Sequence, residues 1–253
     1  MRVQLLRSAT SDRSNLQFAM SYVINDDVAI DAGSLGFQSM ELQQRIQHLF
    51  LTHCHLDHLN SFPLWLDNVF TPTPTAPAVY ANSFTWNAIK TDLLNDRVWP
   101  DLIRIAGAEF PFFVEHVLEN EETRQVSGLE ITPVSINHVV PTFGYIVDDG
   151  TSAVAFVSDT GPTERIWELA RNNPRLKAVF LEASFPERLL WLANKTGHLT
   201  PSLAHAELDK LGLPTPVYFI HLKPQFHDVL TCEILDRGRP ATQIVDAGTV
   251  FEF

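Results

Sequence analysis

The sequence is poor in cysteine, methionine and positive charge. Its 253 residues include 2 cysteines and 3 methionines. Two cysteines are too few for a disulfide framework and are typical of the reduced thiols of an intracellular protein. Lysine and arginine together number 18, against 30 aspartates and glutamates, so the net charge is −12. A surface that follows a long nucleic acid is therefore not expected, because such surfaces are basic.

Long apolar runs and internal repeats are also missing. No stretch approaches the roughly 18 apolar residues that indicate a membrane-spanning helix. The opening segment, MRVQLLRSATSDRSN, becomes polar too soon to supply the apolar core of a secretory signal. With 45% apolar residues and no visible domain boundary, the composition predicts one domain over residues 1–253 with a sizeable core. We expect a cytoplasmic protein that has no membrane partner.

Short apolar runs alternate with helical segments along the chain. Residues 3–6, 21–24 and 28–31 predict an antiparallel meander, and helices are expected over 35–47 and 83–95. The later segments predict strands at 129–136, 178–181, 217–220 and 243–245, a hairpin over 145–157, and helices at 162–172, 186–194 and 201–211. The strand at 243–245 is expected to close the chain. This order predicts an α/β fold, a four-layer αββα sandwich of two mixed sheets with outer helices.

Five of the apolar runs end in a side chain suited to metal binding or acid–base chemistry. These side chains are His53, His138, Asp159, Glu182 and His221. In layered α/β proteins, strand ends and the loops after them form the functional rim, so residues distant in sequence converge there. Polar residues commonly follow strands, which accounts for one or two of the five. The whole set favours a shared site.

The first of these sites is dense in potential ligands. His53, His55, Asp57 and His58 fall within six residues. Imidazole nitrogens and carboxylates together suit zinc, manganese or iron, whereas an all-oxygen set suits magnesium or calcium. Asp57 and His58 are expected to point away from His53 and His55, so that one loop serves two ions. The structural alternative is a polar loop with hydrogen-bonded histidines.

Several motifs carry a family resemblance. THCHLDH, Asn137-His138, SDT at 158–160 and a final His221 resemble the metallo-β-lactamase-fold hydrolases. More narrowly, HCHLDHLNSFPLWLDN, SDTGP, LEASFPE, TGHLTP and IHLKP are similar to the class II cyclic-nucleotide phosphodiesterases. That family hydrolyses 3′,5′-cyclic AMP and, in some members, cyclic GMP. The chain departs from the family pattern at residues 59–62, LNSF, where small residues are usual, and this departure bears on substrate more than on metals.

The resemblance implies two divalent metal ions, with zinc expected and manganese or iron as alternatives. It assigns His53, His55 and His138 to one ion, Asp57, His58 and His221 to the other, and Asp159 to a bridge between them. A hydroxide that bridges the ions would then open the cyclic phosphodiester to the 5′-monophosphate. Asp57 is also counted among the catalytic residues.

A second pair, Glu182 and His198, is implied to supply the general acid. In relatives with similar paired motifs, the histidine protonates the departing oxygen and the glutamate orients it. Asp31 is implied to hold the histidine loop, although a turn aspartate before glycine is an equal alternative. Lys223 is read with equal weight as a phosphate contact or a solvated charge.

The favoured reading is hydrolysis of a small-molecule cyclic nucleotide, and a homodimer is left open. One rival is a transfer-RNA 3′-processing nuclease or another phosphodiesterase with the same dyad, and the net charge opposes a polyanionic substrate. Another is a nucleotide- or metal-binding module without turnover, which would need no proton donor. Five aromatic residues are weighed as a stacking platform for a base, but such residues more often belong to the core. They are Phe62, Trp65, Phe84, Trp86 and Trp99.

Overall fold

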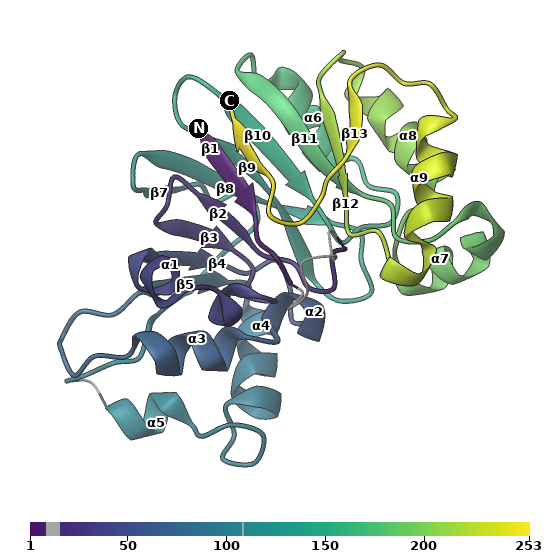
Figure 1. Ribbon diagram of the computed structural model, residues 1–253. Coiled ribbons are helices and arrows are strands. Elements are labelled where there is room, and N and C mark those ends of the chain that lie inside the picture. Colours follow the sequence, from purple (N-terminus) through teal and green to yellow (C-terminus); the bar gives the residue numbers. More distant parts are fainter. Residues whose placement is uncertain (9–15, 108) are drawn as a thin grey trace.

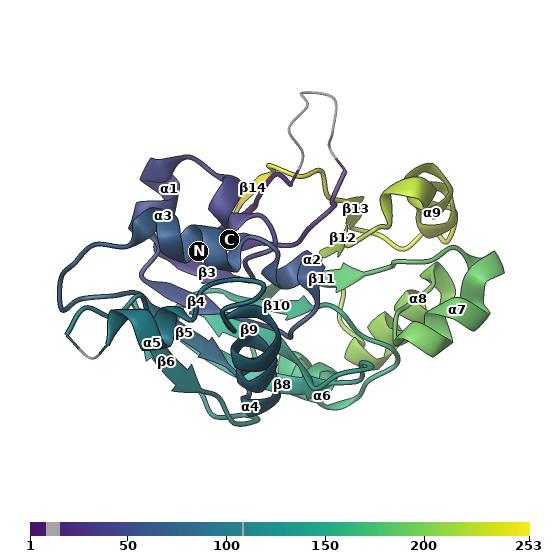
Figure 2. The ribbon, with the colours of Figure 1, turned by 90° about the horizontal axis from the view of Figure 1, so that it is seen from below.

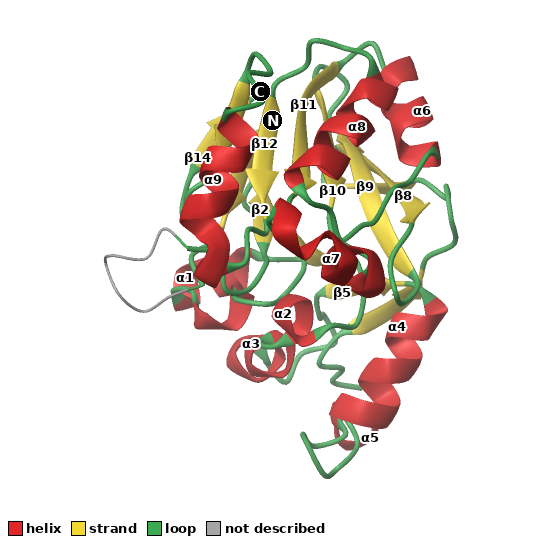
Figure 3. Cartoon of the chain, turned by 90° about the vertical axis from the view of Figure 1, so that its right-hand side faces the viewer, coloured by secondary structure: helices red, strands yellow, loops and turns green. Residues whose placement is uncertain are grey.

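The computed structural model describes residues 1–8, 16–107 and 109–253 and arranges them in four layers (Figures 1 and 3). Two seven-stranded sheets face each other. Helices cover the outer face of each sheet, and the apolar residues form one core between the sheets and one beneath each helical layer. This arrangement confirms the predicted αββα sandwich.

The first sheet has the strand order β14-β1-β2-β3-β4-β5-β6. Its strands are β1 (Arg2–Leu5), β2 (Tyr22–Ile24), β3 (Val28–Ile30), β4 (His48–Phe50), β5 (Ala78–Ala81), β6 (Val114–Val117) and β14 (Val250–Glu252). The first three pair antiparallel, which confirms the meander, and β3 to β6 run parallel. The expectation that 243–245 is the last strand is wrong, because β14 follows and pairs with β1. Three residues are too few to show an alternating pattern.

The second sheet has the order β13-β12-β11-β10-β9-β8-β7. Its strands are β7 (Arg124–Val126), β8 (Leu129–Ile136), β9 (Thr142–Asp148), β10 (Ala153–Val157), β11 (Leu176–Glu182), β12 (Val217–Ile220) and β13 (Thr242–Ile244). Strand β9 is antiparallel to both neighbours, and β10 to β13 are parallel. The carboxyl ends of β8, β10, β11 and β12 therefore lie at the same edge of the sheet.

Helices α1 (Met40–Arg45), α3 (Phe62–Val69) and α4 (Ser83–Ala88) pack on the first sheet, close to the short α2 (Leu56–Leu59) and α5 (Leu102–Ala106). The helix expected over 35–47 is instead a 3-10 turn, Leu35–Phe37, followed by α1. Gln38 between them has extended backbone, and the Ser39 hydroxyl begins α1 by accepting a hydrogen bond from Leu42 N. In the segment 83–95, α4 continues into a π-helical turn, Ile89–Leu93.

Helices α6 (Arg165–Asn172), α8 (Pro201–Leu211) and α9 (His227–Leu235) pack on the second sheet, and α7 (Leu190–Thr196) lies near its edge (Figure 2). Helix α8 has the predicted bounds. Thr200 caps it, Pro201 occupies its first turn, and Gly212 ends it with φ of 65°. Strands β9 and β10 are buried along their whole length, because one face meets the first sheet and the other meets the helices. Over the described ranges, no helix combines the length and apolar character needed to cross a bilayer.

Candidate metal centre

The dense histidine motif lies on the segment that directly follows β4. His53 and His58 are buried, and His55 begins the short helix α2. The structure gathers ligand-type atoms of His53, His55, His138 and Asp159 within 4.8 Å of one another. His138 arrives from the end of β8, and its Nε2 lies 3.3 Å from Nδ1 of His55.

A second group lies beside the first and shares one residue with it. It consists of Asp57, His58, Asp159 and His221, again with ligand atoms within 4.8 Å. His221 follows β12 directly, and its Nε2 lies 3.2 Å from Asp57 Oδ2 and 3.5 Å from Asp159 Oδ1. Asp159 thus stands between the two groups, and both sheets contribute to each group.

The donor atoms fit cations. The Nε2 atoms of His53 and His58 are buried and have no hydrogen-bond partner among the described residues. A buried polar nitrogen without a partner is costly, so these two atoms are explained if they face a metal ion. Imidazole nitrogens with carboxylates form a donor set that suits zinc and similar metals.

The charges of the site favour ligand-competent forms at several positions. Burial alone would raise the pKa of Asp159, but His221 and His58 outweigh it and hold that pKa well below its usual range. Burial lowers the pKa of His53 well below its usual value, and the neighbouring His58 lowers it further. A neutral imidazole and an ionised carboxylate are the forms that bind metal.

Asp31 and Thr52 orient the histidines of the loop. Burial opposes the charged form of His58, yet Asp159 and Asp31 raise its pKa well above the usual value. The Asp31 carboxylate lies 2.6 Å from His58 Nδ1 and accepts hydrogen bonds from the Thr52 amide and hydroxyl. Thr52 Oγ1 is also 3.0 Å from His53 Nδ1. With Nδ1 engaged in both rings, Nε2 is the nitrogen left for the centre.

His221 and His138 are held in the same way by residues that the sequence did not indicate. Ser184 Oγ lies 2.9 Å from His221 Nδ1, and it donates to the His221 carbonyl at 3.0 Å. Gln17 accepts a hydrogen bond from the His221 amide. The Gly197 carbonyl is 2.8 Å from His138 Nδ1.

Glu182 and His198 form a buried pair next to both groups. His198 Nδ1 lies 2.7 Å from Glu182 Oε1, and His198 Nε2 lies 3.9 Å from Asp159 Oδ2. Glu182 also accepts a hydrogen bond from the Thr160 amide at 2.8 Å. Burial would lower the pKa of His198, but the Glu182 carboxylate outweighs it and raises that pKa. The pair can therefore present a proton to whatever lies at the centre.

Lys223 stands at the rim of the second group. Its Nζ is 3.4 Å from Asp57 Oδ2, and the Lys223 and Asp57 side chains are 29% and 30% exposed. A close approach of backbone fixes Asp57 from the other side. A Cβ added at Gly33 would lie 2.0 Å from the Asp57 carbonyl oxygen, so only glycine fits there.

Most of the aromatic candidates lie in the core beneath the first helical layer. Phe62, Trp65 and Trp86 are buried there, Trp99 packs against them, and Phe84 is 45% exposed. They do not surround the centre. Cys54 is half-buried and reduced, and it belongs to neither ligand group.

Comparison with known proteins shows a match to one superfamily profile and similarity to curated proteins. Residues 29–222 match the profile of the Beta-lactamase superfamily domain. A protein of Yersinia pestis named "Probable 3′,5′-cyclic-nucleotide phosphodiesterase" is 26% identical over an alignment of 221 residues, which covers 77% of this chain and 62% of the relative. A protein of Dictyostelium discoideum, "cAMP/cGMP-dependent 3′,5′-cAMP/cGMP phosphodiesterase A", is 25% identical over 67% of this chain and 50% of its own length. The matches thus span only part of both relatives.

Solved structures share the fold. Unliganded yeast PDE1 superposes with a TM-score of 0.74 and 16% identity, covering 96% of each chain. The short form of human tRNase Z gives a TM-score of 0.67 and 15% identity, covering 100% of this chain and 99% of that one. At such identities the likeness extends to the fold alone.

Proposed function

The chain belongs to the beta-lactamase superfamily, to which residues 29–222 match, and from this premise we propose that it is a two-metal phosphodiesterase acting on 3′,5′-cyclic nucleotides. The substrate we propose is cyclic AMP, with cyclic GMP as a second candidate. The observation that carries this proposal is the buried Glu182–His198 pair beside two adjacent ligand groups. A module that only binds metal or nucleotide has no need for such a pair.

We assign the metal-binding role to seven side chains. His53, His55 and His138 would hold one divalent cation, Asp57, His58 and His221 the other, and Asp159 would contact both. When bound, the two cations activate water and compensate negative charge on the phosphoryl oxygens. Zinc fits this donor set best, and manganese and iron remain consistent with it.

The protein's own contribution to the bond cleavage is a proton. As an oxygen from water bonds to phosphorus, the bond from phosphorus to O3′ breaks, and the electron pair stays on O3′. His198 Nε2 donates its proton to that oxygen, while Glu182 holds Nδ1 and stabilises the imidazolium beforehand. The attacking water loses a proton to solvent, solvent reprotonates His198, and the product is the 5′-monophosphate.

One substrate panel tests the proposal. Purified protein reconstituted with zinc or manganese is assayed against cyclic AMP, cyclic GMP, bis(p-nitrophenyl) phosphate and a precursor transfer RNA. We expect turnover of a cyclic nucleotide and of the nitrophenyl ester, both abolished by chelation, with the RNA left intact. Cleavage of the RNA without turnover of either cyclic nucleotide would replace this proposal by the nuclease reading.

Asp159→Ala tests the metal assignment within the same panel. We expect it to lose turnover and to bind less than two equivalents of metal, because the two cations lose the carboxylate that lies between them. Asp67→Ala, on the outer helix α3, is the matched control and should keep both. Elemental analysis that finds two equivalents of metal in an active Asp159→Ala protein would refute the assignment.

A further inference from the structure

A hollow adjoins the candidate metal centre at the carboxyl end of α7. Its volume is about 260 Å³, and its lining includes His138 from the first ligand group and His198 from the buried pair. Asn137, Val139 and Asn194 belong to the same lining. The hollow therefore touches both the residues that would hold metal and the residue that would donate the proton.

We propose that this hollow binds the nucleobase of the substrate and that the Asn194 amide forms a hydrogen bond with the edge of the base. The inference rests on the function proposed above. A general acid must come within about 2.6–3.2 Å of the atom it protonates, so O3′ of the substrate lies at His198 Nε2. C3′ and C1′ belong to one five-membered ring, so the base leaves the ribose close to His198, where the hollow lies.

The chemistry of the lining suits a neutral heteroaromatic ring. Asn194 is exposed on α7 and its amide offers both a donor and an acceptor. Nucleobases present a donor and an acceptor side by side, and a side-chain amide pairs with adenine in this way. Val139, 55% exposed, provides an apolar contact for the face of the ring. Apart from the two histidines, the lining residues that the structure describes are uncharged.

Asn137 helps to fix the wall opposite α7. Its Nδ2 donates a hydrogen bond to the Pro162 carbonyl at 3.1 Å. Gly161 N in turn donates to the Asn137 carbonyl at 2.6 Å. This wall is held by hydrogen bonds to backbone oxygens, whereas Asn194 is exposed in the last turn of α7 and its side chain has no hydrogen-bond partner among the residues that the structure describes.

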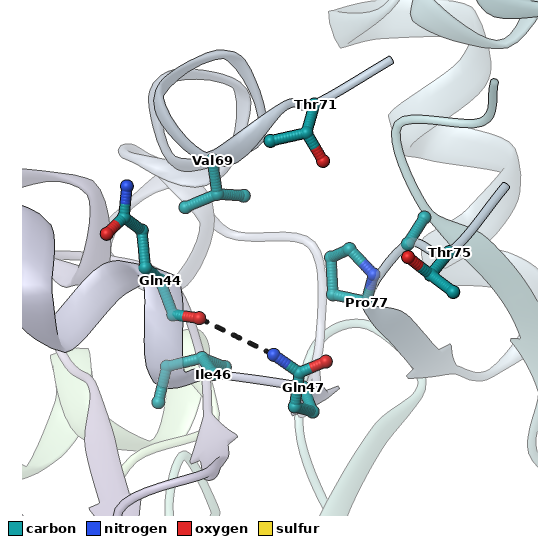
Figure 4. A pocket seen from close by; sticks show the side chains of 8 residues that line it. Gln44, Ile46, Gln47, Val69, Thr71, Thr75 and Pro77 are labelled. Atoms are coloured by element: carbon teal, nitrogen blue, oxygen red, sulfur yellow. Dashed lines mark hydrogen bonds between the residues drawn. The ribbon is translucent and has the colours of Figure 1, made fainter. Parts of the chain in front are cut away.

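A second polar hollow on the protein serves as a matched control. It has a volume of about 290 Å³ and is lined by residues such as Gln44, Gln47 and Thr71, close to the amino end of β4 (Figure 4). Gln47 Nε2 donates to the Gln44 carbonyl, and no residue of either ligand group lines this hollow. Gln44→Ala thus removes an amide from a hollow of similar size in which the proposal places no part of the substrate.

The test compares two ligands that differ only by the base. Isothermal titration measures binding of 5′-AMP and of ribose 5-phosphate to the metal-loaded wild type, Asn194→Ala, Asn194→Leu and Gln44→Ala. Loss of one hydrogen bond predicts about 3- to 10-fold weaker binding of 5′-AMP to both Asn194 variants. Ribose 5-phosphate should bind all four proteins equally. KM for cyclic AMP should rise by the same factor, with kcat and metal content unchanged.

Two outcomes overturn the inference. If both Asn194 variants bind 5′-AMP as tightly as the wild type, Asn194 does not contact the base. If Phe226→Ala, titrated in the same way as a fifth protein, weakens 5′-AMP binding and the Asn194 variants do not, the base lies near Phe226, which packs against Phe185 beside His198. Failure of the proposed function is distinguishable from failure of this inference, because the wild type itself would then hydrolyse neither cyclic nucleotide.

Discussion

The partner of Nδ1 and the place of Nε2 together indicate the role of each histidine here, since Nδ1 of His58 also faces a carboxylate, that of Asp31, while its Nε2 belongs to the second ligand group. His198 and His221 stack nearly parallel, with ring centroids 5.7 Å apart. Nδ1 of His198 faces the Glu182 carboxylate, whereas Nδ1 of His221 faces the Ser184 hydroxyl. A carboxylate partner favours the imidazolium, which donates a proton, while a hydroxyl partner orients a ring without adding a negative charge to it. Two similar side chains thus suit an acid and a ligand.

This difference predicts how His198→Ala behaves. We expect a loss of about 10² to 10⁴ in kcat on cyclic AMP, the usual contribution of a general acid, with both metals retained. The loss on bis(p-nitrophenyl) phosphate should be much smaller, because p-nitrophenolate departs without a proton. Glu182→Gln should follow the same pattern more mildly. The measurement is kcat on both substrates with metal analysis of each protein.

His116→Ala is the matched control for this experiment. His116 stacks on Tyr80 at the edge strand β6 and belongs to neither ligand group. Its substitution should leave the ratio of the two activities unchanged. Equal losses on both substrates in His198→Ala, or loss of metal, would show that His198 is a ligand or a structural residue.

At the scale of elements, Asn82 joins helix α4 to the loop that follows His138. Its Oδ1 caps α4 by accepting a hydrogen bond from Thr85 N at 2.7 Å, and its Nδ2 donates to the Pro141 carbonyl at 3.0 Å. Asn82 is 7% exposed, so both bonds are shielded from water. One side chain therefore begins a helix of the first layer and tethers a loop of the second sheet.

Two variants separate these roles. Asn82→Ala loses cap and tether, and we expect the free energy of unfolding to fall by about 1–3 kcal/mol. Asn82→Asp keeps the cap but lacks the amide donor, so chemical denaturation should give it a stability between those of the wild type and Asn82→Ala. Metal affinity should fall in both, since the loop holding His138 loses its tether. Equal stabilities of Asn82→Asp and the wild type would mean that the tether contributes nothing, and equal stabilities of the two variants would mean that the cap contributes nothing.

Helices and strands were predictable where the hydrophobic pattern is long or where capping residues, proline or glycine mark both ends. Strand β8 and helix α8 have their predicted bounds, since β8 spans eight residues and α8 has a cap, a first-turn proline and a terminal glycine. The chain also contains α2, α3 and α9, which the sequence did not indicate. Helix α2 has only four residues and begins at a histidine without a side-chain cap, so it lacks the usual signals.

For the candidate site, the sequence predicts which residues gather where they are close together along the chain, but not where they are far apart. The four candidates after β4 lie within one short segment, so their gathering follows from the sequence alone. Ser184 and Gln17 could not be found in this way, because they lie 37 and 204 residues from His221 and meet it only through the folded sheets. Hydrogen-bond partners at such separations leave no local pattern.

At the scale of the whole molecule, one charge cluster links stability to pH far from the centre. Asp148 ends β9 and faces Arg175 and Asn173 at the sheet edge opposite the metal ligands. Burial would raise the pKa of Asp148, but hydrogen bonds from Arg175 and Asn173 outweigh it and lower that pKa below its usual 3.8. A carboxyl whose pKa is depressed by folding adds stability above its unfolded pKa, and that stability is lost as pH falls through the folded value.

Asp148→Asn should therefore reduce the dependence of the free energy of unfolding on pH at acid pH. Its free energy of unfolding should be lower than that of the wild type near pH 7, and the difference should shrink between about pH 5 and pH 2. Arg175→Gln should have a smaller effect of the same sign, because Asn173 and the Gly150 amide still hold the carboxylate. Urea unfolding across this range is the measurement, and parallel curves for Asp148→Asn and wild type would contradict the linkage.

Each ligand group draws side chains from both sheets, and this has a mechanical consequence. His53 and His55 follow a strand of the first sheet, while His138 and Asp159 follow strands of the second. An ion bound to all four would act as a reversible cross-link between two halves that also meet through apolar contacts and through hydrogen bonds such as those from Asn82 to Pro141 and from Tyr145 to Leu51. Such a link closes chain loops of about 85 to 105 residues, which removes entropy from any state in which the halves separate. The concentration of available metal would then affect how often the two sheets separate, as well as the rate of turnover.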